Sequence, residues 1–448
     1  MLLRACRQVS TNPLRPIART GKDPELDRGG IMSRYDDRYD TYEYYRRKDE
    51  FYRQQDLRHE HFKEDLRWER EVSARRSELG RKAAREGNMP WAFHWMGATD
   101  QAIELARQRE KPAYRPGKAE RRLKTLLDSA MRNLDLGAFA QAEKEFSRII
   151  DAVPEFAPAY IHRATCRYCR KKFSGAVEDC HAALRLEPGR AILHFRRGRA
   201  YAGLGRMEEA VADYNQAIEL DPEYAPALNS RGLHRMRSRR FEDAVADFSR
   251  VIRLSPEKTA VYLDRGNCRH YLRQYHSAIE DFSASIRLKP TLMPAYLGRG
   301  RCYQAIGKLK AALPDFDRAI ELAPALDDAY RARGNCRLQA GNLPGALTDF
   351  NRAIELNPSY DLNYYERGLY HLKQQNPIKA GVDLEECIRL NPEWGTAYMV
   401  RGDCYLQKKD FKRALRAYEK AKELYKKDGN EKMMQIAGKA CRKVLAGQ

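Results

Sequence analysis

Prolines recur along this chain at a fixed spacing of 34 residues. Eight of them keep this interval without a slip: Pro154, Pro188, Pro222, Pro256, Pro290, Pro324, Pro358 and Pro392. Proline breaks helices because it lacks the backbone N–H and its ring clashes with the preceding turn. A helix breaker at a constant interval therefore predicts a structural unit of 34 residues that repeats along the chain.

Three more series of residues keep the same phase. Ten residues after each proline stands a small residue, which is Ala164 first and then glycine at 198, 232, 266, 300, 334, 368 and 402. Alanine stands twelve residues before each proline, from Ala142 to Ala380. Eight residues before each proline stands a bulky, mostly aromatic residue: Phe146, Tyr214, Phe248, Phe282, Phe316 and Phe350, with Cys180 and Leu384 as exceptions.

This pattern of small, aromatic and proline positions resembles the tetratricopeptide repeat, a helix–turn–helix unit of 34 residues. The resemblance covers residues 123–428 and implies an all-α, right-handed solenoid of nine repeats. In the repeat 259–292 we expect the first helix over about 260–272 and the second over about 276–288. Residues 429–448 predict a helix that caps the last repeat, with Met433, Ile436 and Val444 at helical spacing.

Arginine and aspartate form two further series in this phase. Arginine precedes the small position in eight repeats: Arg163, Arg197, Arg231, Arg265, Arg299, Arg333, Arg367 and Arg401. Aspartate precedes the bulky position in seven: Asp179, Asp213, Asp247, Asp281, Asp315, Asp349 and Asp383. Since the arginines lie on first helices and the aspartates on second helices, we predict a ladder of Arg–Asp pairs that fixes the stacking of the repeats.

The chain has ten cysteines, and half of them follow the repeat. Cys166, Cys268, Cys302, Cys336 and Cys404 fall two residues after the small position. Cysteine packs well there as a small apolar side chain, so we expect a reducing compartment, or at least no disulfide framework. One cluster, Cys166, Cys169, Cys180 and His181, has residue types that suit a metal. Because it lies within repeat units, core packing is the favoured interpretation, and no cofactor is expected.

In proteins similar to this one, the first helices line a concave groove that binds peptides. The groove residues expected in the middle repeats are Asn229, Arg237, Asn267, His270, Tyr271, Arg301, Gln304, Arg331, Asn335 and Gln339. They suit a peptide backbone and acidic side chains. The outer repeats give Ile161, Phe195, Leu369, Leu372, Met399 and Leu406, so the groove should be apolar toward its ends. Alternatively, these residues only keep the concave surface hydrated, or they contact the chain's own N-terminal arm.

Two functional classes are disfavoured. Chaperone-binding members of the family use a clamp of Lys, Asn, Asn, Lys and Arg over three repeats. Arg331 and Asn335 resemble its opening pair, but Leu369 stands where the second Asn belongs. Enzymes are disfavoured because the sequence has no phosphate-cradling Gly-rich loop, no HExxH and no GxSxG.

Residues 1–31 form a basic leader. Arg4, Arg7, Arg15 and Arg19 precede the first acidic residue, Asp23. This composition is typical of a mitochondrial or plastid transit peptide, and a disordered basic tail is the alternative.

Residues 32–87 are highly charged, with 15 Lys/Arg against 14 Asp/Glu. Opposite charges at helical spacing, such as Glu71 and Arg75, predict an extended helical arm. Its aromatic side chains suit a mixed interface with a partner protein or stacking on unpaired bases. The third possibility is a solvated charged helix that makes no specific contact. Residues 88–122 form a tryptophan-containing segment and a linker to the repeats. The residues expected to contact a partner are Tyr35, Tyr39, Tyr42, Tyr45 and Tyr52 of the arm, together with Trp91 and Trp95.

The sequence thus predicts a non-catalytic scaffold or accessory subunit that binds proteins within a large assembly, with an acidic peptide in its groove. The leader favours mitochondria, in a ribosome or respiratory complex. The formal net charge of +21 admits contact with ribosomal RNA through a basic surface, and no apolar run approaches the length of a transmembrane helix. The alternatives are a cytoskeletal or ciliary structural protein and an RNA-associated helical-repeat protein.

Overall fold

The computed structural model describes residues 116–446, which form nineteen helices. Contacts divide these residues into two compact units, 116–367 and 368–446. The predicted leader, the charged arm with its tyrosines, and Trp91 and Trp95 lie outside the described residues.

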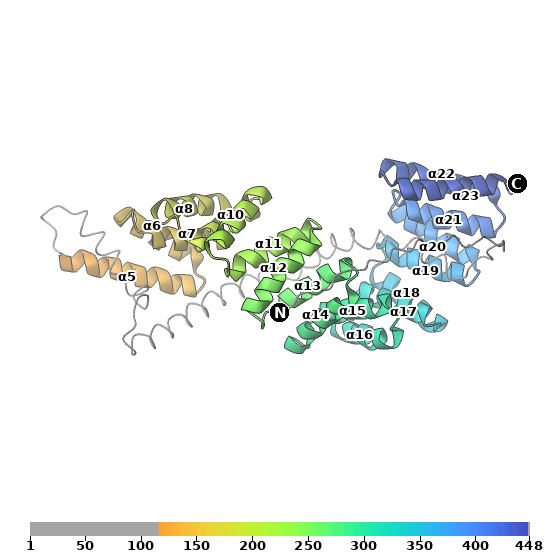
Figure 1. The fold of residues 1–448 in the computed structure, drawn as a ribbon, viewed down its shortest axis with the longest axis horizontal. Coiled ribbons are helices and arrows are strands. Elements are labelled where there is room, and N and C mark those ends of the chain that lie inside the picture. The colour runs from red at the N-terminus through yellow and green to blue at the C-terminus, as the bar shows by residue number, and fades with distance from the viewer. Residues whose placement is uncertain (1–115, 447–448) are drawn as a thin grey trace, which may run out of the picture. The chain divides into compact units, whose positions relative to one another are not determined.

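The first unit is a succession of antiparallel helix pairs (Figure 1). Its helices are α5 (Pro116–Asp135), α6 (Phe139–Ala152), α7 (Ala157–Cys169), α8 (Phe173–Leu186), α9 (Ala191–Gly203), α10 (Met207–Leu220), α11 (Ala225–Arg237), α12 (Phe241–Leu254), α13 (Thr259–Tyr271), α14 (Tyr275–Leu288), α15 (Met293–Ala305), α16 (Leu309–Leu322), α17 (Asp327–Gln339) and α18 (Leu343–Leu356). The unit boundary falls within α19 (Asp361–Lys373).

The second unit continues the same alternation of helices. It contains α20 (Pro377–Leu390), α21 (Gly395–Gln407), α22 (Phe411–Lys427) and α23 (Glu431–Ala446). Helix α23 packs on α22 and buries Ala437 and Val444. The predicted C-terminal capping helix is therefore confirmed.

Each phased proline lies two residues after the end of a second helix. Pro256 follows α12, which ends at Leu254, and Pro290 follows α14, which ends at Leu288. The helix breakers thus separate the repeats, as the spacing predicts. The first helix starts earlier than expected, because α5 includes residues 116–122 of the predicted linker. Pro116 opens it, and proline is tolerated in the first turn, where its missing N–H would have no helical partner.

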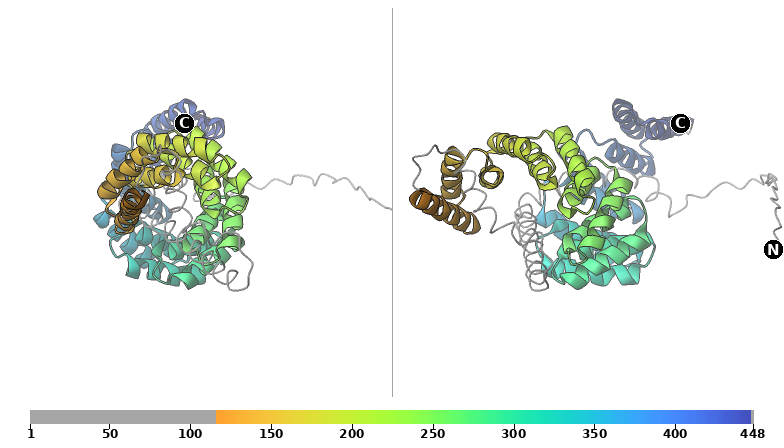
Figure 2. Two further views of the ribbon diagram at one scale, coloured as in Figure 1. Left: turned by 90° about the vertical axis from the view of Figure 1, so that its left-hand side faces the viewer. Right: turned by 60° about the vertical axis from the view of Figure 1, so that its left-hand side comes forward.

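First helices lie on the inner side of a curved row in unit 116–367. Each first helix packs on its own second helix and on the preceding one, and successive first helices also contact one another: α7 with α9, α11 with α13, α13 with α15, and α15 with α17. Helices on the inner side of a bend approach most closely. Figure 2 shows the pairs from α7 to α18 following this curved path, so the inner surface of this unit is built by first helices.

The predicted Arg–Asp ladder is confirmed in six repeats. Its charged N···O distances are 2.6–2.7 Å, in the pairs Arg163–Asp179, Arg197–Asp213, Arg231–Asp247, Arg265–Asp281, Arg299–Asp315 and Arg333–Asp349. Each arginine also reaches the preceding repeat. Arg265 donates to the Ser249 hydroxyl at 3.0 Å, and Arg231 donates to the Asn215 side chain at 2.7 Å. The ladder therefore holds the two helices of one repeat together and ties that repeat to its predecessor.

Close helix packing explains the small position of the repeat. A Cβ on Gly300 would lie 2.7 Å from the Phe316 ring, closer than real Cβ contacts come. Where Leu384 replaces the aromatic residue, a Cβ on Gly368 would meet it at 3.3 Å. Glycine and the aromatic ring are therefore one packing unit, in which the ring fills the space that the missing side chain leaves.

The turn between the helices of each repeat passes through the left-handed region of the backbone. Glycine occupies that position at 137, 205, 307 and 341, but Lys171, Arg239, Arg273, Gln375 and Lys409 adopt it with φ of 52–59°. At Arg239 the turn is a Schellman motif, in which the Arg240 N–H donates to the Arg235 carbonyl. A side chain in this conformation brings its Cβ too close to the following carbonyl oxygen.

Replacing Arg239 with glycine should therefore stabilise the protein. We expect Arg239→Gly to raise the free energy of unfolding by roughly 1 kcal/mol, because glycine adopts φ > 0 without the Cβ clash. Urea denaturation followed by circular dichroism measures the change. The control is Ser238→Gly. Because Ser238 has an ordinary φ of −81°, this substitution should give no increase in the free energy of unfolding. Equal effects of the two substitutions would contradict this explanation.

Candidate functional site

Five of the ten predicted groove residues stand at the fifth or ninth position of a first helix in unit 116–367, one turn apart on the same helix face. We call this set the inner row. This inner row consists of Asn229, Asn267, Arg301, Arg331 and Asn335. Asn229 and Asn267 are both only 7% exposed. The Asn229 Oδ1, Asn267 Nδ2 and Asn335 Oδ1 atoms have no hydrogen-bond partner among residues 116–446. A buried polar atom without a partner costs free energy, so these amides hold unused hydrogen-bonding capacity on α11, α13 and α17.

The two arginines of the inner row are paired within the protein. Arg301 on α15 donates to both Asp328 oxygens, at 2.6 and 2.8 Å. Arg331 on α17 contacts the same carboxylate, and its Nη1 lies 3.9 Å from Glu366. Burial opposes ionisation of Asp328, but Arg301 and Arg331 outweigh it and hold the pKa of this carboxyl below its usual range. The two cations and two carboxylates balance, so an acidic ligand would have to compete with Asp328.

The other five predicted groove residues lie near the ends of the first helices, where the chain turns into the second helix. This helix-end group consists of Arg237, His270, Tyr271, Gln304 and Gln339. Arg237 and Gln339 are exposed, and the other three are half-buried. The Tyr271 ring stacks on Phe241 with centroids 4.9 Å apart. The predicted groove residues therefore divide into two groups, the inner row and the helix-end group.

The outer part of the predicted groove requires a correction. Ile161 is 5% exposed, Phe195 is fully buried and Met399 is 1% exposed. Leu369 and Leu372 are buried as well. Phe195 and Met399 fill the packed interior rather than line an apolar groove, because a large apolar residue on a first helix gains more from the seam between helices than from an open surface. Ile161, Leu369 and Leu372 are about as buried as Asn229, Asn267 and Arg331, so burial does not separate them from the polar part of the predicted groove. The predicted apolar ends were wrong for Phe195 and Met399.

Sequence reasoning did not identify Asp328, Glu366 or Phe241 as part of these surfaces. Asp328 is the second residue of its repeat, and Arg301 is the ninth residue of the preceding one. A search for opposite charges at these two positions of adjacent repeats would have found the pair.

The predicted packing of the repeat cysteines is confirmed. Cys166, Cys268, Cys302 and Cys336 are fully buried, and Cys404 is 1% exposed. Burial raises the pKa of the Cys166 thiol to about 12, which disfavours the thiolate that binds metals. Between residues 116 and 446, no three His, Cys, Asp or Glu side chains gather as a possible metal site.

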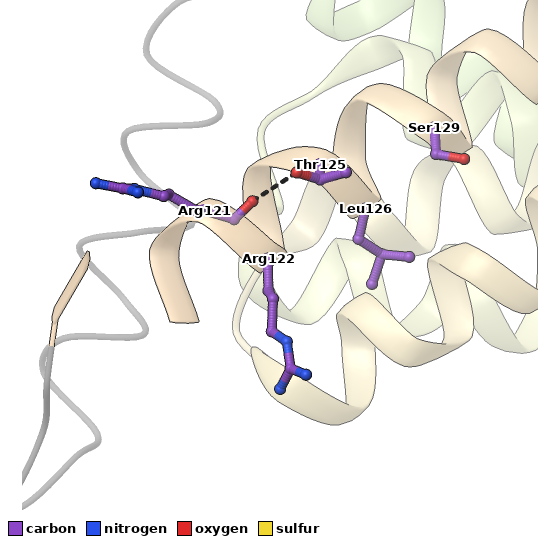
Figure 3. A pocket seen from close by; sticks show the side chains of 5 residues that line it. All are labelled: Arg121, Arg122, Thr125, Leu126 and Ser129. Carbon is purple, nitrogen blue, oxygen red and sulfur yellow. Dashed lines mark hydrogen bonds between the residues drawn. The ribbon is translucent and has the colours of Figure 1, made fainter. Parts of the chain in front are cut away.

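Two further features of residues 116–446 bear on whether this part of the chain holds a small molecule or crosses a membrane. A shallow hollow on α5 is lined by Arg121, Arg122, Thr125, Leu126 and Ser129 (Figure 3). This hollow is wide open and is lined by side chains of a single helix. Pockets that hold small molecules are instead enclosed and have polar groups that converge on the ligand. No helix in this part of the chain combines the length and apolar character needed to cross a membrane.

Comparisons with known proteins agree with the repeat. The tetratricopeptide repeat family matches residues 191–224, 229–292, 294–326, 334–375 and 395–428. A search of curated proteins finds no match to this chain.

Solved structures with similar helix pairs include MamA (25% identity, 39% of this chain and 95% of MamA covered, TM-score 0.34). YrrB, described as a TPR protein with an unusual peptide-binding site, has 24% identity, with 41% of this chain and 95% of YrrB covered and a TM-score of 0.34. Yeast Tom70 has 14% identity, with 81% and 96% covered and a TM-score of 0.43. From the five family matches and the phased helix pairs it follows that this chain is a tetratricopeptide repeat protein.

Proposed function

We propose that this protein is a non-catalytic scaffold that binds an extended segment of a partner protein along the inner row. The observation that carries the proposal is the set of amides at Asn229, Asn267 and Asn335, each of which has one buried atom without a hydrogen-bond partner among residues 116–446. A peptide backbone offers alternating N–H and C=O groups. Rotation about χ2 exchanges the positions of the two amide atoms, so each asparagine can present either a donor or an acceptor.

The charge balance around Asp328 refines which peptides the groove favours. Arg301 and Arg331 already hold a carboxylate, so recognition of the peptide backbone is the main contribution, and an acidic side chain binds only by displacing Asp328. Selection of 15-residue peptides from a displayed library against the full chain would identify the ligands.

Substituting all three asparagines with alanine should lower the affinity for the selected peptides by about 100-fold. Three lost hydrogen bonds at about 1 kcal/mol each give this magnitude. The unfolding midpoint should stay the same or rise, because alanine removes three buried amide atoms that lack partners among residues 116–446. Isothermal titration calorimetry measures the affinity, and the matched control is alanine at Gln216 and Thr348, exposed polar residues on second helices. Equal affinities of the two variants would exclude the inner row as the binding site.

Membership of a large mitochondrial assembly is the finer part of the proposal, and its support is the basic composition of residues 1–31. The full chain and a variant lacking residues 1–31 can be tagged at the C-terminus and imaged in cells, with proximity labelling to identify neighbours. We expect only the full chain in mitochondria. The same extramitochondrial distribution for both would instead favour the cytoskeletal or ciliary role.

A further inference from the structure

Basic residues gather on one edge of unit 116–367. This turn edge consists of the turns that join the two helices of each repeat, at residues 135–140, 169–174, 203–208, 237–242, 271–276, 305–310 and 339–344. It carries ten Lys/Arg against three Asp/Glu, and all ten basic side chains are exposed: Arg170, Lys171, Lys172, Arg206, Arg237, Arg239, Arg240, Arg273, Lys308 and Lys310.

The opposite edge has the other sign. The loops between repeats, at residues 153–156, 187–190, 221–224, 255–258, 289–292, 323–326 and 357–360, carry three basic residues against five acidic ones. Because every repeat stacks in the same orientation, equivalent loops follow one edge of the solenoid. Glu143, Glu209 and Asp243 stand just outside the turns and pair with Arg170, Lys172, Arg206 and Arg240. Even with these three carboxylates included, the turn edge is the positive side of this unit.

Aromatic rings cluster on the turn edge where α11–α14 meet. Phe241 and Tyr271 stack with 10° between their planes, and His270 lies edge-on to Tyr271 and Tyr275 with centroids 5.7 and 5.6 Å away. All four rings are half-buried rather than enclosed in the core. Rings that are held by packing but partly exposed offer faces on which another flat group can stack.

Three arginines flank this cluster within two successive turns. Arg237 and Arg239 precede Phe241, and Arg273 lies between Tyr271 and Tyr275. Arg239 and Arg273 stand at the left-handed position with φ of 59° and 57°, where four other repeats have glycine and three have Lys171, Gln375 or Lys409. Long cations thus stand in the same turns as the ring-bearing residues, at two positions where the backbone favours glycine.

We propose that the turn edge at α11–α14 binds single-stranded nucleic acid. Arg237, Arg239 and Arg273 would neutralise phosphates, and the rings of Tyr271 and its neighbours would stack on unpaired bases, the combination by which proteins hold single strands without reading their sequence. An acidic polypeptide would use the cations but not the rings, which is why a nucleic acid is the favoured ligand. The site is separate from the inner row and does not depend on the peptide-binding proposal.

Fluorescence anisotropy of the full chain with fluorescein-labelled U20 and dT20 tests this site, with the KCl concentration varied. We expect binding that weakens steeply with salt. Arg239→Gly/Arg273→Gly should reduce the slope of log K against log [salt] by roughly 1.4, since each contact to a single-stranded phosphate contributes about 0.7. Tyr271→Leu should weaken binding by roughly 5- to 100-fold with the slope unchanged, because it removes stacking and leaves the charge intact.

The matched control is Lys408→Gln/Lys409→Gly, which removes two exposed cations from a turn in the other unit. It should bind within about twofold of the unaltered protein, and circular dichroism would verify the fold of every variant. The triple-alanine variant of the inner row should keep its affinity for U20, which separates the two proposals. Three results would overturn the site: no binding of either strand, equal losses in the control and the arginine variant, or displacement of U20 by a 20-residue oligoglutamate as readily as by unlabelled U20.

Discussion

Asp281→Ala is expected to lower the free energy of unfolding by about 3 kcal/mol. The Asp281 side chain is 3% exposed and accepts hydrogen bonds from Arg265 at 2.6 Å and Arg269 at 2.8 Å. Removing one partner of a buried pair costs about 3–5 kcal/mol, because the remaining charge stays buried without compensation. The lower end applies here, since Arg265 and Arg269 keep 14% and 19% of their side-chain surface exposed.

Urea denaturation measures the total loss, and amide hydrogen exchange shows where it occurs. Because a repeat contacts only its neighbours, the lost protection should concentrate in α13 and α14 and in the adjoining helices. Glu321→Ala removes the exposed pair between Glu321 and Arg318 and should leave the midpoint unchanged. A loss for Asp281→Ala no larger than that for Glu321→Ala would show that the ladder does not hold the repeats together.

Gly300→Ala is expected to lower the free energy of unfolding by about 1–3 kcal/mol. The new Cβ would lie 2.7 Å from the fully buried Phe316 ring. Either the ring leaves its rotamer or α15 and α16 move apart, and overpacking of this kind costs about 1–3 kcal/mol. The greater helix propensity of alanine, worth up to about 1 kcal/mol, opposes the loss only in part.

Gly381→Ala is the matched control, because a Cβ at this helical glycine of α20 meets no atom within 4 Å. It should stabilise the protein by up to about 1 kcal/mol through helix propensity. The double variant Gly300→Ala/Phe316→Leu should recover part of the loss, since Leu384 leaves more room in front of Gly368. Thermal and urea denaturation of the three variants would check this, and destabilisation by Gly381→Ala equal to that by Gly300→Ala would rule out the clash with Phe316.

Most of the fold was predictable because it depends on residues at fixed distances along the chain. The breaker at Pro256 and the pair formed by Gly266 and Phe282 recur in the other repeats, so each copy supports the interpretation of the rest. The helices α13 and α14 accordingly begin and end within one residue of their predicted bounds. The ladder pair Arg265–Asp281 was predictable for the same reason, because its two residues are always 16 apart.

The candidate surfaces were less predictable, because their properties come from residues that do not follow the repeat. Arg301 and Arg331 were expected to grip a ligand, yet both contact Asp328, an acidic residue that the other repeats do not share at this position. The helical phase placed Phe195 in the groove, but its ring is fully buried. Side chains of this kind take their roles from the neighbouring repeat, and a pattern along one repeat does not contain that information.

The sequence by itself determined the repeat, its helices and the pairing of arginine with aspartate, because helix breaking, close packing and i, i+16 pairing all operate over short stretches of chain. Only the tertiary structure decided that Asp328 pairs with the inner arginines, that Asn229 and Asn267 each keep a buried amide atom without a partner among residues 116–446, and that Phe241 stacks on Tyr271. The physical reason is that these contacts join different repeats. Their distances are set by the stacking and curvature of the helix pairs, which no single 34-residue unit specifies.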